Sequence, residues 1–204
     1  MSFVAELKRR NVIRVAGLYL VGAWFIVQVT STVLPMFDAP PWLPRSIASL
    51  GHLDEAEQAI RKAIELASAS GIFDASLVVI DVHRGDAKTA LADAERALPG
   101  IWQDYALAMA RQIGNDRMAA DAALKLIVDK YADGMAFQIA EVYALRREPD
   151  KIFEWLDRAW ANRDPGLQYF FVNPVLLRYR DDPRFATFCK KVGLPSTTTA
   201  KALP

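Results

Sequence analysis

The sequence repeats itself at an interval of 34 residues, from Gly51 to Gly85. The run GHLDEA at 51–56 aligns with the run GDAKTA at 85–90. Small and apolar residues recur at matching offsets after each glycine, first as Ala56, Ile60 and Ala63 and then as Ala90, Ala94 and Ala97. A period of this length is typical of chains that stack copies of one supersecondary unit. The chain is therefore predicted to fold as a repeat array.

A further copy of the pattern lies towards the C-terminus. The run REPDKI at 147–152 occupies the turn position and is followed by Leu156 and Ala159. Ala140 and Tyr143 precede it by seven and four residues. This copy is the only one with both a small–aromatic pair before the turn and a clean second helix after it.

A looser copy begins at GND, residues 114–116, which is 29 residues after Gly85. Apolar residues at 3.6-residue spacing run through the whole region, and this spacing predicts helices. The run SLVVIDV at 76–82 would suit a strand in isolation, but its place in the repeat favours a helix.

These residues resemble the tetratricopeptide repeat (TPR), a helical hairpin with small residues where its two helices cross and a Gly-Asp-type turn between them. The resemblance covers residues 46–164 and implies about three degenerate repeats in an all-α fold. The first copy has only RSIASL before Gly51, which is too short for a full first helix. We therefore expect a half-repeat there.

An uncharged stretch at 15–34, VAGLYLVGAWFIVQVTSTVL, precedes the repeats. Twenty helical residues span about 30 Å, the thickness of a bilayer core. A transmembrane helix is predicted, although a signal peptide, a buried soluble helix and an interfacial helix are alternatives. Residues 1–14 carry a basic excess, from Lys8, Arg9, Arg10 and Arg14 against Glu6. This excess predicts a cytoplasmic N-terminus and a single-pass inner-membrane protein whose repeat domain lies in the periplasm.

The segments on either side of the repeats differ from them in composition. Residues 35–45 contain four prolines and predict a stiff linker. Residues 165–195 are expected to form a C-terminal capping segment with a helix, and residues 196–204 a flexible tail. The runs at 2–29 and 178–195 resemble the two ends of bacterial membrane-anchored proteins that combine a TolB-like region with TPRs. The middle region of that family is missing here, as is its second apolar helix.

Composition excludes several classes of function. Twenty-five Lys and Arg against 24 Asp and Glu give a net charge of +1, which argues against a nucleic-acid partner. One cysteine, Cys189, and two histidines, His52 and His83, argue against a metal site or a His-based catalytic triad. We find no phosphate loop or catalytic motif, so we expect neither an enzyme nor a cofactor. Cys189 is expected to be buried, and the histidines to be solvated or to cap helices.

The sequence instead favours protein–protein interaction at the membrane surface. TPR-like arrays bind peptides or partner segments on the concave face of their first helices, with the bilayer as second partner through residues 15–34. Counting positions within each repeat unit places six candidate partner-binding residues on that face: Val79, Asp104, Ala108, Arg111, Phe137 and Glu141. Alternatives are a regulatory component of a signalling system linked to a cyclase or to transcription, an enzyme with an unfamiliar site, and a remnant without independent function. The oligomeric state is not predicted.

Five aromatic residues gather around the last repeat, namely Trp155, Trp160, Tyr169, Phe170 and Phe171. We expect them to form the core that joins this repeat to the capping helix. The alternative is an exposed hydrophobic groove for a partner helix.

Overall fold

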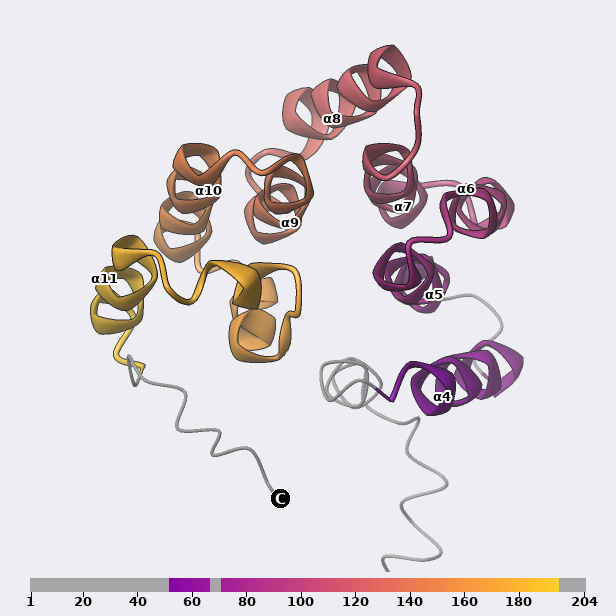
Figure 1. Ribbon diagram of the computed structural model, residues 1–204, viewed down its shortest axis with the longest axis horizontal. Helices are drawn as coiled ribbons and strands as arrows, with labels where there is room; N and C mark the ends of the chain where they lie inside the picture. Colours follow the sequence, from indigo (N-terminus) through magenta and orange to yellow (C-terminus); the bar gives the residue numbers. More distant parts are fainter. Residues whose placement is uncertain (1–51, 67–70, 195–204) are drawn as a thin grey trace, which may run out of the picture. The chain divides into compact units, whose positions relative to one another are not determined.

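The computed structural model describes residues 52–66 and 71–194, and within these ranges the chain is helical, without β-strands (Figure 1). The predicted all-α class is thereby confirmed, and the run at 76–82 lies inside a helix. The elements are α4 (Leu53–Leu66), α5 (Gly71–Arg84), α6 (Ala87–Arg96), α7 (Ile101–Gln112), α8 (Arg117–Tyr131), α9 (Ala136–Arg146), α10 (Pro149–Ala161), the 3₁₀ helices η1 (Pro165–Val172) and η2 (Leu176–Tyr179), and α11 (Pro183–Lys191).

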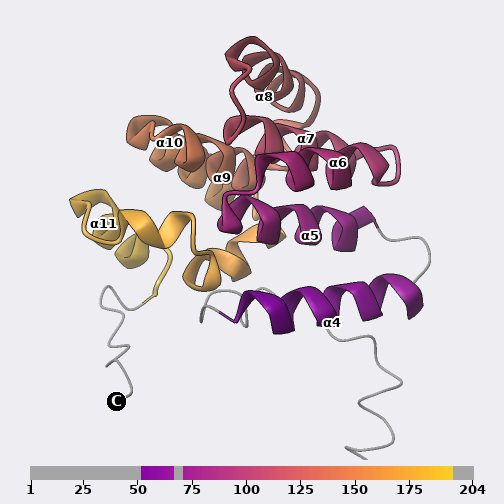
Figure 2. The same cartoon turned by 45° about the vertical axis from the view of Figure 1, so that its right-hand side comes forward.

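Helices α5 to α10 form two rows (Figures 1 and 2). Helix α7 packs against both α5 and α9, so these three helices make up one row. Helices α6, α8 and α10 each pack against the preceding helix and form the other row. We call the row of α5, α7 and α9 the inner row and the row of α6, α8 and α10 the outer row. Helix α4 packs on α5 of the inner row, and η1 contacts both α9 and α10.

The turns between paired helices fall where the sequence predicts them. Asp86 caps α6 by accepting a hydrogen bond from the backbone N–H of Thr89 at 3.0 Å. Asp116 caps α8 in the same way, from Ala119 at 2.9 Å. A side-chain acceptor at this position satisfies a backbone donor that the first helical turn leaves unpaired. Arg147 ends α9 in the left-handed conformation, at φ 62°.

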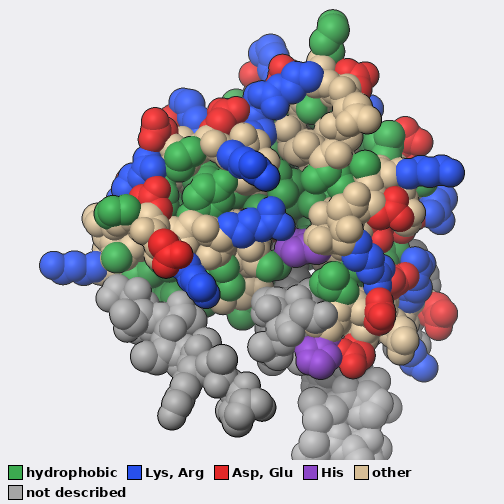
Figure 3. Space-filling view, viewed as in Figure 1, with side chains coloured by type: hydrophobic (Ala, Val, Ile, Leu, Met, Phe, Trp, Pro, Cys, Tyr) green, Lys and Arg blue, Asp and Glu red, His purple; other side chains and the backbone are tan. Residues whose placement is uncertain are grey.

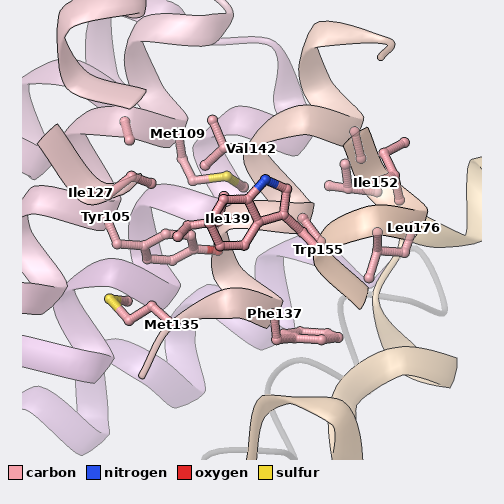
Figure 4. Packing of buried hydrophobic residues seen from close by; sticks show 14 of the residues in the cluster. Tyr105, Met109, Ile127, Met135, Phe137, Ile139, Val142, Ile152, Trp155 and Leu176 are labelled. Atoms are coloured by element: carbon pink, nitrogen blue, oxygen red, sulfur yellow. The ribbon is translucent and has the colours of Figure 1, made fainter. Parts of the chain in front are cut away.

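Small residues occupy the crossings between the rows. The alanines that define the repeat pattern at Ala90, Ala94 and Ala140 are completely buried. A methyl side chain lets two helix backbones approach closely, so larger side chains can fill only the space beside each crossing. Figure 4 shows Met109, Ile139 and Trp155 filling such a space.

The C-terminal segment closes the array with aromatic rings. Phe170 of η1 stacks on Phe185 of α11 with ring centroids 4.7 Å apart, and it contacts Phe188 at 5.1 Å. Trp155, Tyr169 and Phe170 are buried and Phe171 is half-buried, which agrees with the expected aromatic core. Trp160 differs, because it is 43% exposed on α10.

The lone cysteine lies in this closing segment. Cys189 is buried, as predicted, and burial raises the pKa of its thiol. Because the thiolate is the reactive form, this environment keeps the side chain unreactive.

Several predicted segments lie outside the described residues, namely 1–14, 15–34, 35–45 and 196–204. Among the helices that the structure does describe, none is long and apolar enough to cross a membrane. The transmembrane helix at 15–34 stays a prediction.

Ala140→Arg is expected to lower the free energy of unfolding by about 3 kcal/mol or more, because the new side chain overpacks a helix crossing and buries a charge. Thermal unfolding followed by circular dichroism measures the effect. Ala122→Arg is the matched control, because Ala122 is exposed on α8. Equal melting of the two variants would contradict the packing described above.

Candidate functional site

The six residues predicted to bind a partner do not share one surface. Val79 is half-buried and Glu141 is buried, and the two line a common cleft. Ala108 and Phe137 are completely buried, so neither contributes to the accessible surface. The cleft therefore brings together only Val79 and Glu141 of the predicted set.

The other two predicted residues belong to α7 and face the outer row. Asp104 accepts hydrogen bonds from two residues of α8, from the Tyr131 hydroxyl at 2.7 Å and from the Lys130 ammonium at 3.3 Å. Arg111 lines a shallow groove with Leu91 of α6 and Ala119 of α8. The stripe predicted on α7 therefore lies against the neighbouring helices and not in the cleft.

The cleft on the inner row, called here the inner cleft, lies between α4, α5, α9 and the segment at η1. Its walls are mainly aliphatic, and the space within them is about 20 Å³, room for one water molecule. The lining residues are Ile60, Ser76, Val79, Ile80, His83, Glu141, Tyr169, Val172, Asn173 and Pro174.

A buried polar network supports one side of this cleft. The Glu141 carboxylate is 1% exposed and accepts hydrogen bonds from the Tyr105 hydroxyl at 2.9 Å and from the Asn173 side-chain amide. Asn173 Oδ1 in turn accepts from the backbone N–H groups of Val175 at 3.1 Å and Leu176 at 3.0 Å. A buried carboxylate is tolerated only with such donors. The network therefore fixes the chain after η1 against α7 and α9.

His83 supplies the other polar group of the inner cleft. Its Nδ1 lies 2.6 Å from the Val79 carbonyl oxygen, which can only accept, so Nδ1 carries the proton and Nε2 is an acceptor. Nε2 is buried and has no hydrogen-bond partner among the described residues. Burial lowers the pKa of His83, so the ring is neutral at pH 7. His52 is exposed, as expected, and lies 2.6 Å from Glu55. His83 is half-buried instead of solvated, and its ring bonds to a backbone carbonyl in the last turn of α5.

Sequence reasoning missed His83 as a lining residue and missed Tyr105 and Asn173 entirely. Neither Tyr105 nor Asn173 stands at a position that the repeat pattern marks. The only available signal was the dipeptide Asn173-Pro174, because a side chain that accepts from the backbone two residues later is typical of asparagine at a turn.

A second polar cluster lies between α5 and α6, away from the cleft. Asp81 and Asp93 are both buried, and each has one Oδ2 atom without a hydrogen-bond partner among the described residues. Arg84 lies 3.7 Å from Asp81 and pairs more closely, at 2.5 Å, with Asp54 and Glu57 of α4. Burial and then the charge of Asp93 raise the pKa of Asp81 to about 6.

This cluster does not form a metal centre. Within residues 52–66 and 71–194, no group of three or more His, Cys, Asp or Glu side chains is arranged to hold a metal ion. The two carboxylates lie between the helices of one hairpin, and their position makes the stability of that hairpin sensitive to pH.

The sequence matches no family model, and no curated protein and no solved structure is significantly similar to it. The geometry of the inner cleft is therefore the basis for a functional proposal.

Asp81→Asn is expected to stabilise the chain at pH 8, because it removes a buried charge that faces Asp93 and Glu57. The folded state holds the Asp81 proton up to about pH 6, against an ordinary value of 3.8. The parent should therefore regain stability as pH falls from 7 towards 4, and the difference between the two chains should disappear. Thermal unfolding of the full chain in detergent at pH 8, 6 and 4.5 measures this difference.

The control for this experiment is Asp54→Asn, because Asp54 pairs with the same Arg84 but its side chain is 89% exposed. This variant should not be stabilised at pH 8. A gain for Asp81→Asn that is equally large at all three pH values would contradict the pKa assigned to Asp81.

Proposed function

We propose that the chain is a membrane-tethered interaction scaffold of the TPR type, which binds a peptide or a segment of a partner protein on its inner row. The proposal rests on the 34-residue sequence period together with the pairing of α5–α6, α7–α8 and α9–α10. Arrays built in this way present one row of helices for binding.

The observation that carries the proposal is the inner cleft. Its half-buried Val79 and Val172 offer aliphatic contact area to a partner that lies over the cleft, and the one water molecule that fits inside can donate to the buried Nε2 of His83. The half-buried Val79 places an apolar side chain at this site.

The tether is the apolar segment at 15–34, with its basic flank in the cytoplasm. The scaffold would then meet its partners on the periplasmic side of the inner membrane. A tether also raises the local concentration of the scaffold for partners in the same membrane, so modest affinity for a short segment is sufficient.

A photo-crosslinking amino acid placed at Val79 of the full chain is expected to give discrete adducts in intact membranes, because this position lines the inner cleft. The same amino acid at Lys125 is the control, since that side chain is 74% exposed on α8 of the outer row. Adducts are detected by electrophoresis and mass spectrometry. Identical adduct patterns at the two positions would contradict binding on the inner row.

Protease treatment tests the proposed topology. Trypsin is expected to cleave after residue 45 in spheroplasts and to leave the same region intact in inverted membrane vesicles, because the basic flank retains the N-terminus in the cytoplasm. Immunoblotting with an antibody against the C-terminal region gives the result. Cleavage in inverted vesicles only would place the repeats in the cytoplasm and reverse the proposed orientation.

A further inference from the structure

Each helix of the inner row has an arginine in its last turn, and two of these three arginines pair with the helix that comes before them in the chain. Arg84 of α5 pairs with Glu57 of α4 at 2.5 Å. Arg146 of α9 pairs with Asp121 of α8 at 2.5 Å. The third, Arg111 of α7, is half-buried, and its side chain forms no ion pair or hydrogen bond with any residue in the described part of the chain.

The carboxylate that Arg111 lacks has a fixed position in the repeat. Glu57 is the fifth residue of α4 and Asp121 is the fifth residue of α8, and each follows a buried alanine. The fifth residue of α6 is Leu91, which follows the buried Ala90 in the same way. The array therefore has an acidic residue at this position in the helices on both sides of α6, and a leucine in α6 itself.

Leu91 and Arg111 line the same groove, called here the outer groove, which lies between α6 and α8 over α7. Its volume is about 250 Å³, against about 20 Å³ in the inner cleft. Ala110 and Ala119 form part of its wall, and their methyl groups leave much of the space between the helices unfilled. Figure 3 shows hydrophobic side chains on this part of the surface, over α6 and α8. The outer groove therefore has room for an aliphatic side chain of a partner.

The polar groups of the outer groove favour a carboxylate beside that side chain. Asp116 also lines the groove, but it caps α8 by accepting from the Ala119 backbone N–H at 2.9 Å and forms no ion pair with Arg111. A guanidinium group offers two parallel N–H donors, which suit the two oxygen atoms of a carboxylate. Because Arg111 is half-buried, water screens such a pair less than it screens a pair on the open surface.

We infer that the outer groove binds a segment of a partner protein in which an acidic residue lies next to an aliphatic residue. The acidic side chain takes the place that Glu57 and Asp121 have in the neighbouring units and pairs with Arg111. The aliphatic side chain packs against Leu91. This inference goes beyond the proposed function, because the surface is on the outer row and its occupation does not depend on a partner at the inner row.

The test uses displayed random eight-residue peptides and the full chain in detergent micelles. Peptides that bind the parent chain are counter-selected against the Leu91→Glu variant, in which the new carboxylate is expected to pair with Arg111 and so compete with the ligand. The peptides that remain should combine an Asp or Glu with an adjacent Leu, Ile or Val. Fluorescence anisotropy of the labelled peptides then gives their affinities.

Arg111→Gln should weaken the binding of these peptides by about tenfold, the order of a close ion pair at an interface. Leu91→Gln is the size-matched control for Leu91→Glu and should cost less affinity, because it leaves Arg111 without a partner. Arg178→Gln is the control for the loss of a positive charge, since Arg178 is exposed on η2 and does not line the outer groove. An equal loss of affinity in the Arg178 and Arg111 variants would overturn the inference.

Thermal unfolding tests the geometry without any peptide. In the Leu91→Glu background, Arg111→Gln should lower the melting temperature by about 2 °C, the effect of one partly exposed ion pair in a chain of this size. In the parent background the same substitution should leave the melting temperature unchanged. Circular dichroism measures both effects and verifies that each variant is folded. Equal shifts in the two backgrounds would show that position 91 is out of reach of Arg111 and would overturn the inference.

The remaining outcomes separate this inference from the proposed function. Crosslinked adducts at Val79 should persist in the Leu91→Glu variant, because they report on the inner row. A counter-selection that leaves no peptide, or only peptides without an acidic residue, would overturn the inference and leave the proposed scaffold untouched. Self-association of the full chain that Leu91→Glu abolishes, measured by light scattering, would assign the outer groove to a second copy and would also overturn it.

Discussion

The hydrogen bonds to the buried Glu141 carboxylate are the interaction on which the arrangement around the inner cleft depends. They connect Tyr105 of α7, Glu141 of α9 and Asn173 of the segment after η1, in addition to the packing between these elements. A buried carboxylate that loses one donor becomes costly, and this cost ties the three elements to one relative position. Two further hydrogen bonds act in the same direction, because Asp164 at the start of η1 accepts from the Phe137 backbone N–H at 3.0 Å and Tyr179 of η2 donates to the Ala144 carbonyl oxygen at 2.7 Å.

Packing of small residues sets the spacing that this network needs. Ala140 lies one residue before Glu141, and both are buried on α9, one at a helix crossing and the other facing Tyr105. Because a repeat array makes contacts mainly between neighbours, each crossing affects only the adjacent hairpins. The array therefore needs a closure at its C-terminal end, which Phe170, Phe185 and Phe188 provide.

The parts of the fold that sequence could predict are those determined by local chemistry. Turns at 85–86 and 114–116 follow from glycine and aspartate, whose conformational freedom and side-chain oxygen act within a few residues. Positions within the repeat unit could not predict which neighbours the side of α7 with Asp104 and Arg111 would face. The neighbours that orient Asp104 and Arg111 come from α6 and α8, and the shortened 29-residue spacing changes how these helices meet.

The lining of the inner cleft could be predicted only in part, because four of its ten lining residues do not belong to the repeats. Val79 and Glu141 follow from the repeat offset, but Tyr169, Val172 and Asn173 come from the closing segment, which has no counterpart in the other units. The burial of Phe137 has the same origin, since Gly166 of η1 lies so close that a Cβ atom there would come within 2.7 Å of its ring.

This dependence on the closing segment has a consequence for where binding can occur. Polar groups inside the network are paired with one another, whereas the imidazole Nε2 of His83 has no hydrogen-bond partner within the described chain. Natural folds rarely leave a buried acceptor without a donor unless water or a ligand supplies one. Because η1 carries Tyr169 and Val172 and the segment after it carries Asn173, the part of the chain that completes the fold at one end also shapes the cleft. If the inner row binds a partner as proposed, stability of the C-terminal cap and recognition are therefore coupled through the same residues.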